Sequence, residues 1–126
     1  MKRTIVKTSE APTAGPYSQA VKAGELLFVS AQMPLYPKDG TLVPGGVEAE
    51  ARQVLKNLEQ VLVAGDSSLK NVVKTTVYLT NLDDFGKVNE IYAEFFRQDP
   101  PARACVGVSR LPKSASVAIE AVAIAK

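Results

Sequence analysis

The last strand that the sequence predicts, residues 117–125, is apolar on both of its sides. Successive side chains of a strand point to opposite faces of a sheet. One side of this strand carries Val117, Ile119, Ala121 and Ala123, and the other carries Ala118, Val122 and Ile124 around Glu120. Such a strand belongs in a sheet that is covered on both faces, so something must pack on each side of it.

The rest of the chain supplies only two helices to cover this sheet. Apolar residues recur every three or four positions over 48–64 and again over 85–95, which predicts two amphipathic helices. Short β-branched and apolar runs predict the other strands at 3–7, 19–22, 26–32, 72–79 and 102–108. This order predicts an α+β domain with a single sheet. Because two helices cover one face only, we expect an oligomer in which another subunit covers the other.

Turn and capping residues mark the ends of these elements. Ala23-Gly24-Glu25 predicts a hairpin turn, and residues 11–16 predict a loop after the first strand. Gly65 is expected to end the first helix, and Asp83 or Asp84 is expected to cap the second.

Length and composition set further bounds on the chain. Its 126 residues predict one domain, 1–126, and the 15 Lys plus Arg are scattered among 13 Asp plus Glu, for a net charge of +2. No basic patch predicts a nucleic-acid partner, and no apolar run is long enough for a signal peptide or a membrane span. We therefore expect a cytoplasmic protein with no membrane partner.

The chain has no histidine, no tryptophan and a single cysteine, Cys105. A serine or cysteine nucleophile activated by imidazole is therefore excluded, and so is a zinc site of the usual Cys/His type. A Cys-X-X-Cys pair and an internal disulfide are excluded as well. Chemistry must come from Glu, Asp, Arg, Lys, Tyr, Ser, Thr, the single thiol or the backbone.

Two charged residues on predicted strands are candidates for that chemistry. Glu120 lies between Ala118 and Val122 on an apolar face, where an unpaired carboxylate is costly to bury. It is either a structural residue that forms an ion pair or reaches water, or a general base that positions water. Arg103 has a planar guanidinium suited to a carboxylate, supplied either by Glu120 or by a small ligand. The residues alone leave both alternatives open.

Four further residues have a structural and a functional interpretation. Cys105 shares a face with Arg103 and is either a small buried apolar residue or part of a site. Tyr17 either fixes its turn through the hydroxyl or lines a pocket. Ser30 and Asn89 are either ordinary hydrogen-bonded or boundary residues, or ligand contacts.

Five segments together resemble the Rid (YjgF) family of enamine/imine deaminases, and the match runs in order along nearly the whole chain. The segments are Gly15-Pro16-Tyr17-Ser18-Gln19-Ala20, Phe28-Val29-Ser30-Ala31-Gln32-Met33-Pro34, Val73-Lys74-Thr75-Thr76-Val77-Tyr78-Leu79, Pro101-Ala102-Arg103-Ala104-Cys105-Val106 and Ile119-Glu120-Ala121. The resemblance implies a chorismate-mutase-like α+β fold, with one mixed sheet and two helices on one face. It also implies a homotrimer with a pocket in each cleft between subunits.

The resemblance further implies a reaction and the residues that carry it. Arg103 would bind the substrate carboxylate, helped by the backbone at Cys105, and Glu120 would orient or activate the attacking water. Tyr17, Ser30 and Asn89 would line the same pocket, with no metal and no organic cofactor. The reaction would be hydrolysis of 2-aminoacrylate/2-iminopropanoate and 2-iminobutanoate, released by pyridoxal-phosphate enzymes, to 2-oxo acids and ammonia.

The sequence departs from the family pattern at three positions, and two other functions are compatible with the resemblance. Ala31, Ala104 and Gly107 stand where the family commonly has Gly, Ser, and Glu or Gln, which affects the expected substrate range. The alternatives are a non-catalytic trimer that binds small carboxylates and an endoribonuclease that inhibits translation. The absence of histidine and of a basic patch disfavours the nuclease.

Overall fold

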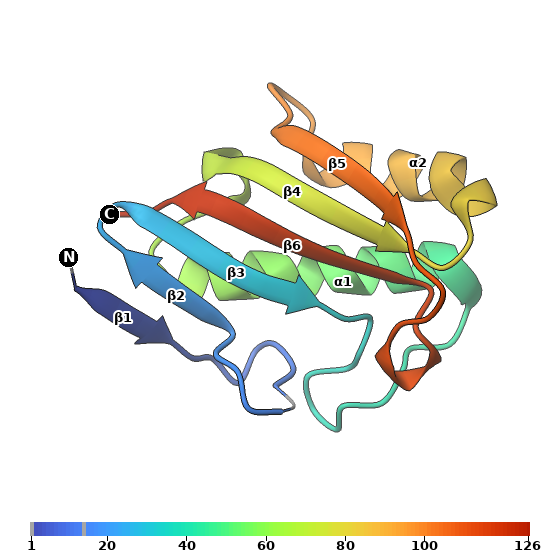
Figure 1. Cartoon of the computed structure of the whole chain (residues 1–126), viewed down its shortest axis with the longest axis horizontal. Helices are drawn as coiled ribbons and strands as arrows, with labels where there is room; N and C mark the ends of the chain where they lie inside the picture. The colour runs from blue at the N-terminus through green and yellow to red at the C-terminus, as the bar shows by residue number, and fades with distance from the viewer. Residues whose placement is uncertain (1, 14) are drawn as a thin grey trace.

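The computed structural model describes residues 2–13 and 15–126, and its strands form one mixed sheet with two helices (Figure 1). Ala14, within the predicted loop 11–16, lies outside the described residues. The strands are β1 (Arg3–Val6), β2 (Ala20–Ala23), β3 (Leu26–Gln32), β4 (Val72–Leu79), β5 (Ala102–Gly107) and β6 (Val117–Ile124). The helices are α1 (Gly46–Ala64) and α2 (Phe85–Phe95), with short 3-10 turns at Leu69–Asn71, Leu82–Asp84 and Pro112–Ser114.

The sheet has the strand order β1-β2-β3-β6-β4-β5. All neighbouring strands are antiparallel except β4 and β5, which α2 joins as a crossover. Strand β6 lies in the middle, between β3 and β4, and β5 forms one edge. The predicted α+β class with a single mixed sheet is confirmed.

Both helices cover the same face of the sheet, as predicted. Helix α1 packs beneath β3 and β6, and α2 packs beside α1 (Figure 1). Leu27 on β3, Leu58 on α1 and Ile119 on β6 have no exposed surface and are part of the core between these layers. An exposed ion pair between Arg52 and Glu94, 2.7 Å from Nη1 to Oε1, joins the two helices.

The opposite face of the sheet, called the open face below, is apolar and uncovered in one copy of the chain. Leu26, Phe28 and Ile124 are 42%, 46% and 50% exposed, and Val122 is half-buried beside them. The strand pairs Phe28↔Val122 and Leu26↔Ile124 make these side chains contiguous. A sheet face of this composition is suited to contact with another protein surface.

The helix ends differ in part from the prediction. Helix α1 does end at Gly65, but its φ of −94° is ordinary, and the left-handed residue is Asp66. Glycine leaves space for the buried Leu27 there, since a Cβ on Gly65 would lie 2.6 Å from Leu27 Cδ2 and would force that side chain to shift. The prediction that an Asp side chain caps α2 was wrong: Asp84 precedes the helix without a capping bond, and Asn81 caps the 3-10 turn before it.

Across residues 2–13 and 15–126, the structure has no helix that is both long enough and apolar enough to span a membrane.

Candidate functional site

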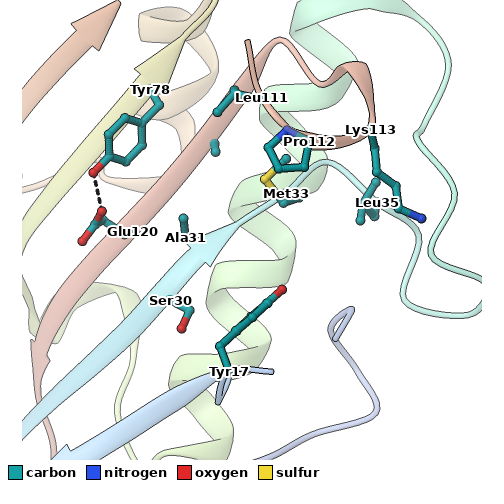
Figure 2. Close-up of a pocket in the computed structure, with 11 residues that line it drawn as sticks. Tyr17, Ser30, Ala31, Met33, Leu35, Tyr78, Leu111, Pro112, Lys113 and Glu120 are labelled. Atoms are coloured by element: carbon teal, nitrogen blue, oxygen red, sulfur yellow. Dashed lines mark hydrogen bonds between the residues drawn. The ribbon is translucent and has the colours of Figure 1, made fainter. Parts of the chain in front are cut away.

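A hollow of about 490 Å³ lies on the open face, where β3, β6 and β4 meet the loop before β6 (Figure 2). Its polar part is formed by Tyr17, Ser30, Tyr78 and Glu120. Its apolar part is formed by Ala31, Met33, Leu35, Leu111, Pro112 and Ala118, with Lys113 at the rim. Three of the predicted site residues, Tyr17, Ser30 and Glu120, therefore lie together in one hollow.

Glu120 is held in this hollow by Tyr78. Strand β4 pairs Thr76 with Glu120 and Tyr78 with Ala118, so Tyr78 and Glu120 lie on one face of adjacent strands. The Tyr78 hydroxyl donates a hydrogen bond to Glu120 Oε1 (Figure 2). This bond, with burial and the nearby negative charge, raises the pKa of the Tyr78 phenol above its usual range. The pair leaves Glu120 Oε2 free of that bond.

Strand β3 carries Ser30 into the hollow at an irregularity in its pairing. The register of β3 against β6 shifts between Val29 and Gln32, as expected for a bulge that redirects side chains beside a site. The Ser30 hydroxyl donates to the Ser18 carbonyl at 2.6 Å, and the Ser30 amide donates to the Gln19 carbonyl. Ser30 thus ties β3 to the loop that carries Tyr17.

The Tyr17 side chain lies across the hollow from the Tyr78–Glu120 pair (Figure 2). Its ring packs against Gly15, which has a φ of +111° and where a Cβ would lie 3.2 Å from the ring. The Tyr17 amide donates to the Gly15 carbonyl, but among the described residues the hydroxyl has no hydrogen-bond partner. Of the two alternatives for Tyr17, the described residues support a side chain that lines the hollow, with the turn held by the backbone and the ring.

Two buried amide side chains hold the walls of the hollow. Gln19, 4% exposed, donates from Nε2 to the carbonyls of Thr8 and Ala11 at 3.0 and 3.1 Å, and so holds the loop preceding Tyr17. Asn57 on α1, 1% exposed, donates from Nδ2 to the carbonyls of Met33 and Leu35, both at 3.0 Å. Fully bonded buried amides of this kind make the hollow rigid.

Arg103 lies on the other side of the sheet, against α2. Its register partner on β4 is Thr75, which is fully buried on the helix-covered face. Arg103 Nη1 donates to Asn89 Oδ1 at 2.8 Å, and the guanidinium carbon lies 4.8 Å from the ring centre of Tyr92 and 5.3 Å from that of Phe85. Within residues 2–13 and 15–126, no carboxylate forms a salt bridge with Arg103. Most of its N–H groups are therefore available to a ligand.

Cys105 shares this side with Arg103, as predicted from their spacing, and pairs with the buried Val77. The residue is half-buried and packs on the core. Burial raises the pKa of the Cys105 thiol, while nearby Arg103 acts in the opposite direction. The thiol is therefore protonated at neutral pH, which fits the apolar interpretation of this residue.

The structure thus divides the predicted site residues into two groups on opposite faces of the sheet. Tyr17, Ser30 and Glu120 lie in the hollow, while Arg103, Asn89 and Cys105 lie at the β5 edge beside α2. Arg103 and Glu120 do not pair with each other. Tyr78, which contacts Glu120, was missed: its strand was predicted, but nothing in the sequence showed which residue of β4 faces Glu120.

No cluster of three or more Cys, Asp or Glu side chains that could hold a metal ion exists in the described part of the chain.

Comparison with known proteins gives consistent matches over nearly the whole chain. The family model described as Endoribonuclease L-PSP matches residues 8–125. A mouse protein named 2-iminobutanoate/2-iminopropanoate deaminase is 50% identical over 97% of this chain and 91% of its own length. A RutC family protein from Pyrococcus horikoshii is 48% identical over 96% and 97%.

Solved structures agree with this chain over the same extent. A protein from Thermotoga maritima has a TM-score of 0.95 and 47% identity, covering 100% of this chain and 99% of its own. RidA from an Antarctic Psychrobacter has a TM-score of 0.93 and 39% identity, covering 96% and 98%. E. coli TdcF with bound serine has a TM-score of 0.92 and 39% identity, covering 98% and 99%.

Proposed function

The chain belongs to the Rid (YjgF) family, which the Endoribonuclease L-PSP model describes, and we propose that it is an imine deaminase. Its substrates are 2-aminoacrylate/2-iminopropanoate and 2-iminobutanoate, which it hydrolyses to 2-oxo acids and ammonia. These imines are reactive products of pyridoxal-phosphate enzymes, and their removal is the proposed cellular role. The name of the mouse relative supports this activity.

The observation that carries the proposal is the environment of the Arg103 side chain. Its guanidinium is half-buried between two aromatic rings and has Asn89 as its hydrogen-bond partner, without a salt bridge in the described part of the chain. A guanidinium held in this way presents a planar pair of donors that matches a carboxylate. A 2-imino acid carries that carboxylate next to its imine carbon. E. coli TdcF, a structural neighbour of this chain, was solved with bound serine, which also carries a carboxylate.

The open face supports a site shared between two copies of the chain. Arg103 and Glu120 lie on opposite faces of one sheet, so a single copy does not direct both groups at one ligand. Strand β5, which carries Arg103, is an edge strand, and the open face around Phe28 and Ile124 is apolar. We propose a homotrimer in which the β5 edge of one subunit lies beside the hollow of the next.

The proposed reaction requires few groups because imines already hydrolyse in water. Arg103 fixes the substrate carboxylate. Glu120 accepts a proton from a water molecule while the oxygen of that water bonds to the imine carbon. The C=N electron pair moves to nitrogen, which then takes the proton from Glu120. Glu120 then takes the proton of the new hydroxyl group and passes it to the nitrogen, so that the C–N bond breaks as the C=O bond forms and ammonia leaves. This route involves no change of oxidation state, and we propose that no cofactor takes part.

Hydrolysis of an imine generated in situ tests this function. A serine dehydratase supplies 2-iminopropanoate, semicarbazide competes for the imine, and the release of pyruvate is followed. We expect the wild-type protein to accelerate release, Glu120→Ala to bind carboxylates without hydrolysis, and Arg103→Ala to lose both. No acceleration by the wild-type protein would exclude the deaminase, and retained carboxylate binding would then favour the regulator.

Mixed trimers test whether the site is shared. A trimer built from Arg103→Ala and Glu120→Ala subunits contains one junction with an intact Arg103 facing an intact Glu120. In a 1:1 co-refolded mixture about three quarters of the trimers are mixed, so the mixture should regain up to about one quarter of the wild-type rate, whereas each variant alone stays inactive. Mixtures that remain inactive despite confirmed co-assembly would contradict a site shared in this way.

The nuclease alternative has a separate test. The hollow contains a carboxylate, which repels a phosphodiester, and Lys113 is the one lysine that lines it. We expect no RNA cleavage by repurified protein. Cleavage that survives repurification and disappears in a site variant would reverse this conclusion.

A further inference from the structure

We propose that Tyr78 is a positioning residue for imine hydrolysis: it holds one oxygen of Glu120 and directs the other toward the attacking water. The inference rests on the proposed function. It goes beyond that function because it gives a role to a residue outside the predicted site, on a different strand.

The contact arises from the register of two neighbouring strands. Glu120 on β6 faces Thr76 on β4, and Tyr78 is two residues further along β4 on the same face. A diagonal neighbour of this kind is within reach of a long aromatic side chain. The Tyr78 hydroxyl donates a hydrogen bond to Glu120 Oε1, and both residues lie across the hollow from Tyr17 (Figure 2).

A glutamate in an open hollow needs such a partner to act as a base. Its side chain has several rotatable bonds, and a base works only when its oxygen is within hydrogen-bond reach of the proton it takes. Tyrosine has two such bonds and, in Tyr78, a ring half-buried on the sheet, so it is the more rigid member of the pair. The bond to Oε1 leaves Oε2 as the oxygen that receives the proton from water.

Tyr78 keeps its own proton during this step. The same hydrogen bond raises the pKa of the Tyr78 phenol, so the phenol stays neutral and acts as a donor at neutral pH. Both protons of the water molecule, the second from the new hydroxyl group, enter on Oε2 and leave from Oε2 to the substrate nitrogen. Atoms and charges then balance without transfer through Tyr78, which is why its role is positioning.

The other titratable groups around the pair do not take over this contact. Lys113 lines the rim of the hollow, but its Nζ donates to the Gly40 carbonyl at 3.3 Å. Lys74 lies on the same face of β4, opposite Val122, and Tyr17 lies on the other side of the hollow, with its hydroxyl pointing away from the pair. Among the described residues, Tyr78 is the side chain that hydrogen-bonds Glu120.

The Tyr78→Phe variant tests the inference because it removes the hydroxyl and keeps the ring. We expect kcat to fall about tenfold while KM changes less than about twofold, since orientation of the base is lost and carboxylate binding is not. Tyr36→Phe is the matched control: Tyr36 is an exposed tyrosine outside the lining of the hollow, and its kcat should not change. An unchanged kcat in Tyr78→Phe, or a rise in KM alone, would overturn the inference.

A second measurement tests the pair without any substrate. The ultraviolet absorbance of tyrosinate is titrated in the wild type and in Tyr78→Phe, and the difference gives the titration of Tyr78 alone. In the Glu120→Gln background we expect the Tyr78 pKa to fall toward its ordinary value of about 10. An identical Tyr78 titration with and without the Glu120 carboxylate would overturn the inference.

The two measurements separate failure of the inference from failure of the proposed function. If wild-type protein does not hydrolyse imines but the Tyr78 pKa still falls in Glu120→Gln, the proposed function is wrong and the positioning role fails with it, although the pair exists. If wild-type protein is active and Tyr78→Phe equals it, only the inference is wrong.

Discussion

The two faces of the sheet are both apolar, but they differ in what covers them. The helix-covered face is closed within one copy of the chain: Leu27 and Ile119 have no exposed surface there. The open face leaves Phe28 and Ile124 about half exposed and surrounds a hollow with a carboxylate. Burial of the first face stabilises the fold of one chain, while the second face leaves apolar surface and a carboxylate for the proposed assembly and reaction.

The polar groups of the two faces follow the same division. Arg103 and Asn89 are bonded to each other beneath the edge strand, and Glu120 and Tyr78 are bonded to each other in the hollow. Each pair forms within its own face, and each leaves hydrogen-bonding groups for a ligand. A reaction that needs Arg103 and Glu120 together therefore depends on bringing a second copy to the open face.

A charge placed on the open face should have the largest effect, because this face is the proposed interface between subunits. Phe28→Asp puts a carboxylate on the proposed interface, where burial without a partner costs several kcal/mol. We expect sedimentation at the 13.5 kDa mass of one chain, an unchanged far-ultraviolet circular dichroism spectrum and complete loss of hydrolysis.

The control for this variant is on the other side of the molecule. Val63→Asp changes an apolar residue that is 58% exposed on α1, and assembly and activity should be kept. Wild-type mass in Phe28→Asp would show that the open face is not the interface.

Truncation of one side chain on each face should lower the free energy of unfolding by different amounts. Leu58→Ala removes a fully buried side chain between α1 and the sheet, and should lower the free energy of unfolding by about 2–5 kcal/mol. Leu26→Ala on the open face, measured in the monomeric Phe28→Asp background, should cost less than about 1 kcal/mol.

Urea denaturation measures both variants, and the monomeric background removes the concentration dependence that assembly adds to stability. Equal losses for Leu58→Ala and Leu26→Ala would contradict the division between the faces.

An added methyl group should have a smaller effect than the truncation of Leu58. Gly65→Ala places a Cβ 2.6 Å from Leu27 Cδ2, and should destabilise the fold by about 1–3 kcal/mol through overpacking. Gly86→Ala on α2 meets nothing within 4 Å and should gain up to about 1 kcal/mol from helix propensity. Thermal unfolding of both variants checks the signs, and a stabilised Gly65→Ala would show that Leu27 moves freely.

Periodicity predicted the elements of the fold because each has a burial pattern that local sequence can reveal. Strand β4 spans 72–79 as predicted, and β6 ends one residue earlier than predicted. The two-sided apolar character of β6 also indicated that two helices would leave one face open. This conclusion needed only the alternation of side chains and the number of helices.

Strand order and register limited what could be predicted of the site. Spacing placed Arg103 and Cys105 on one face, but only the pairing of β5 with β4 shows that this is the helix-covered face. The Tyr78–Glu120 contact depends on the register of β4 against β6, which includes an irregularity between Val72 and Lys74. Such long-range pairing leaves no local signal. Gly65 was similarly placed correctly but for a reason that requires the position of Leu27.

The central position of β6 has a consequence for how the protein is made. Residues 117–124 follow every other element in the sequence, yet they separate β3 from β4 in the sheet. During synthesis the β1–β3 meander and the β4-α2-β5 unit cannot join into one sheet until these residues leave the ribosome. Joining them is a slow, long-range step that leaves apolar strand edges unpaired meanwhile. Truncation within β6 should therefore yield aggregating chains, not a smaller folded protein.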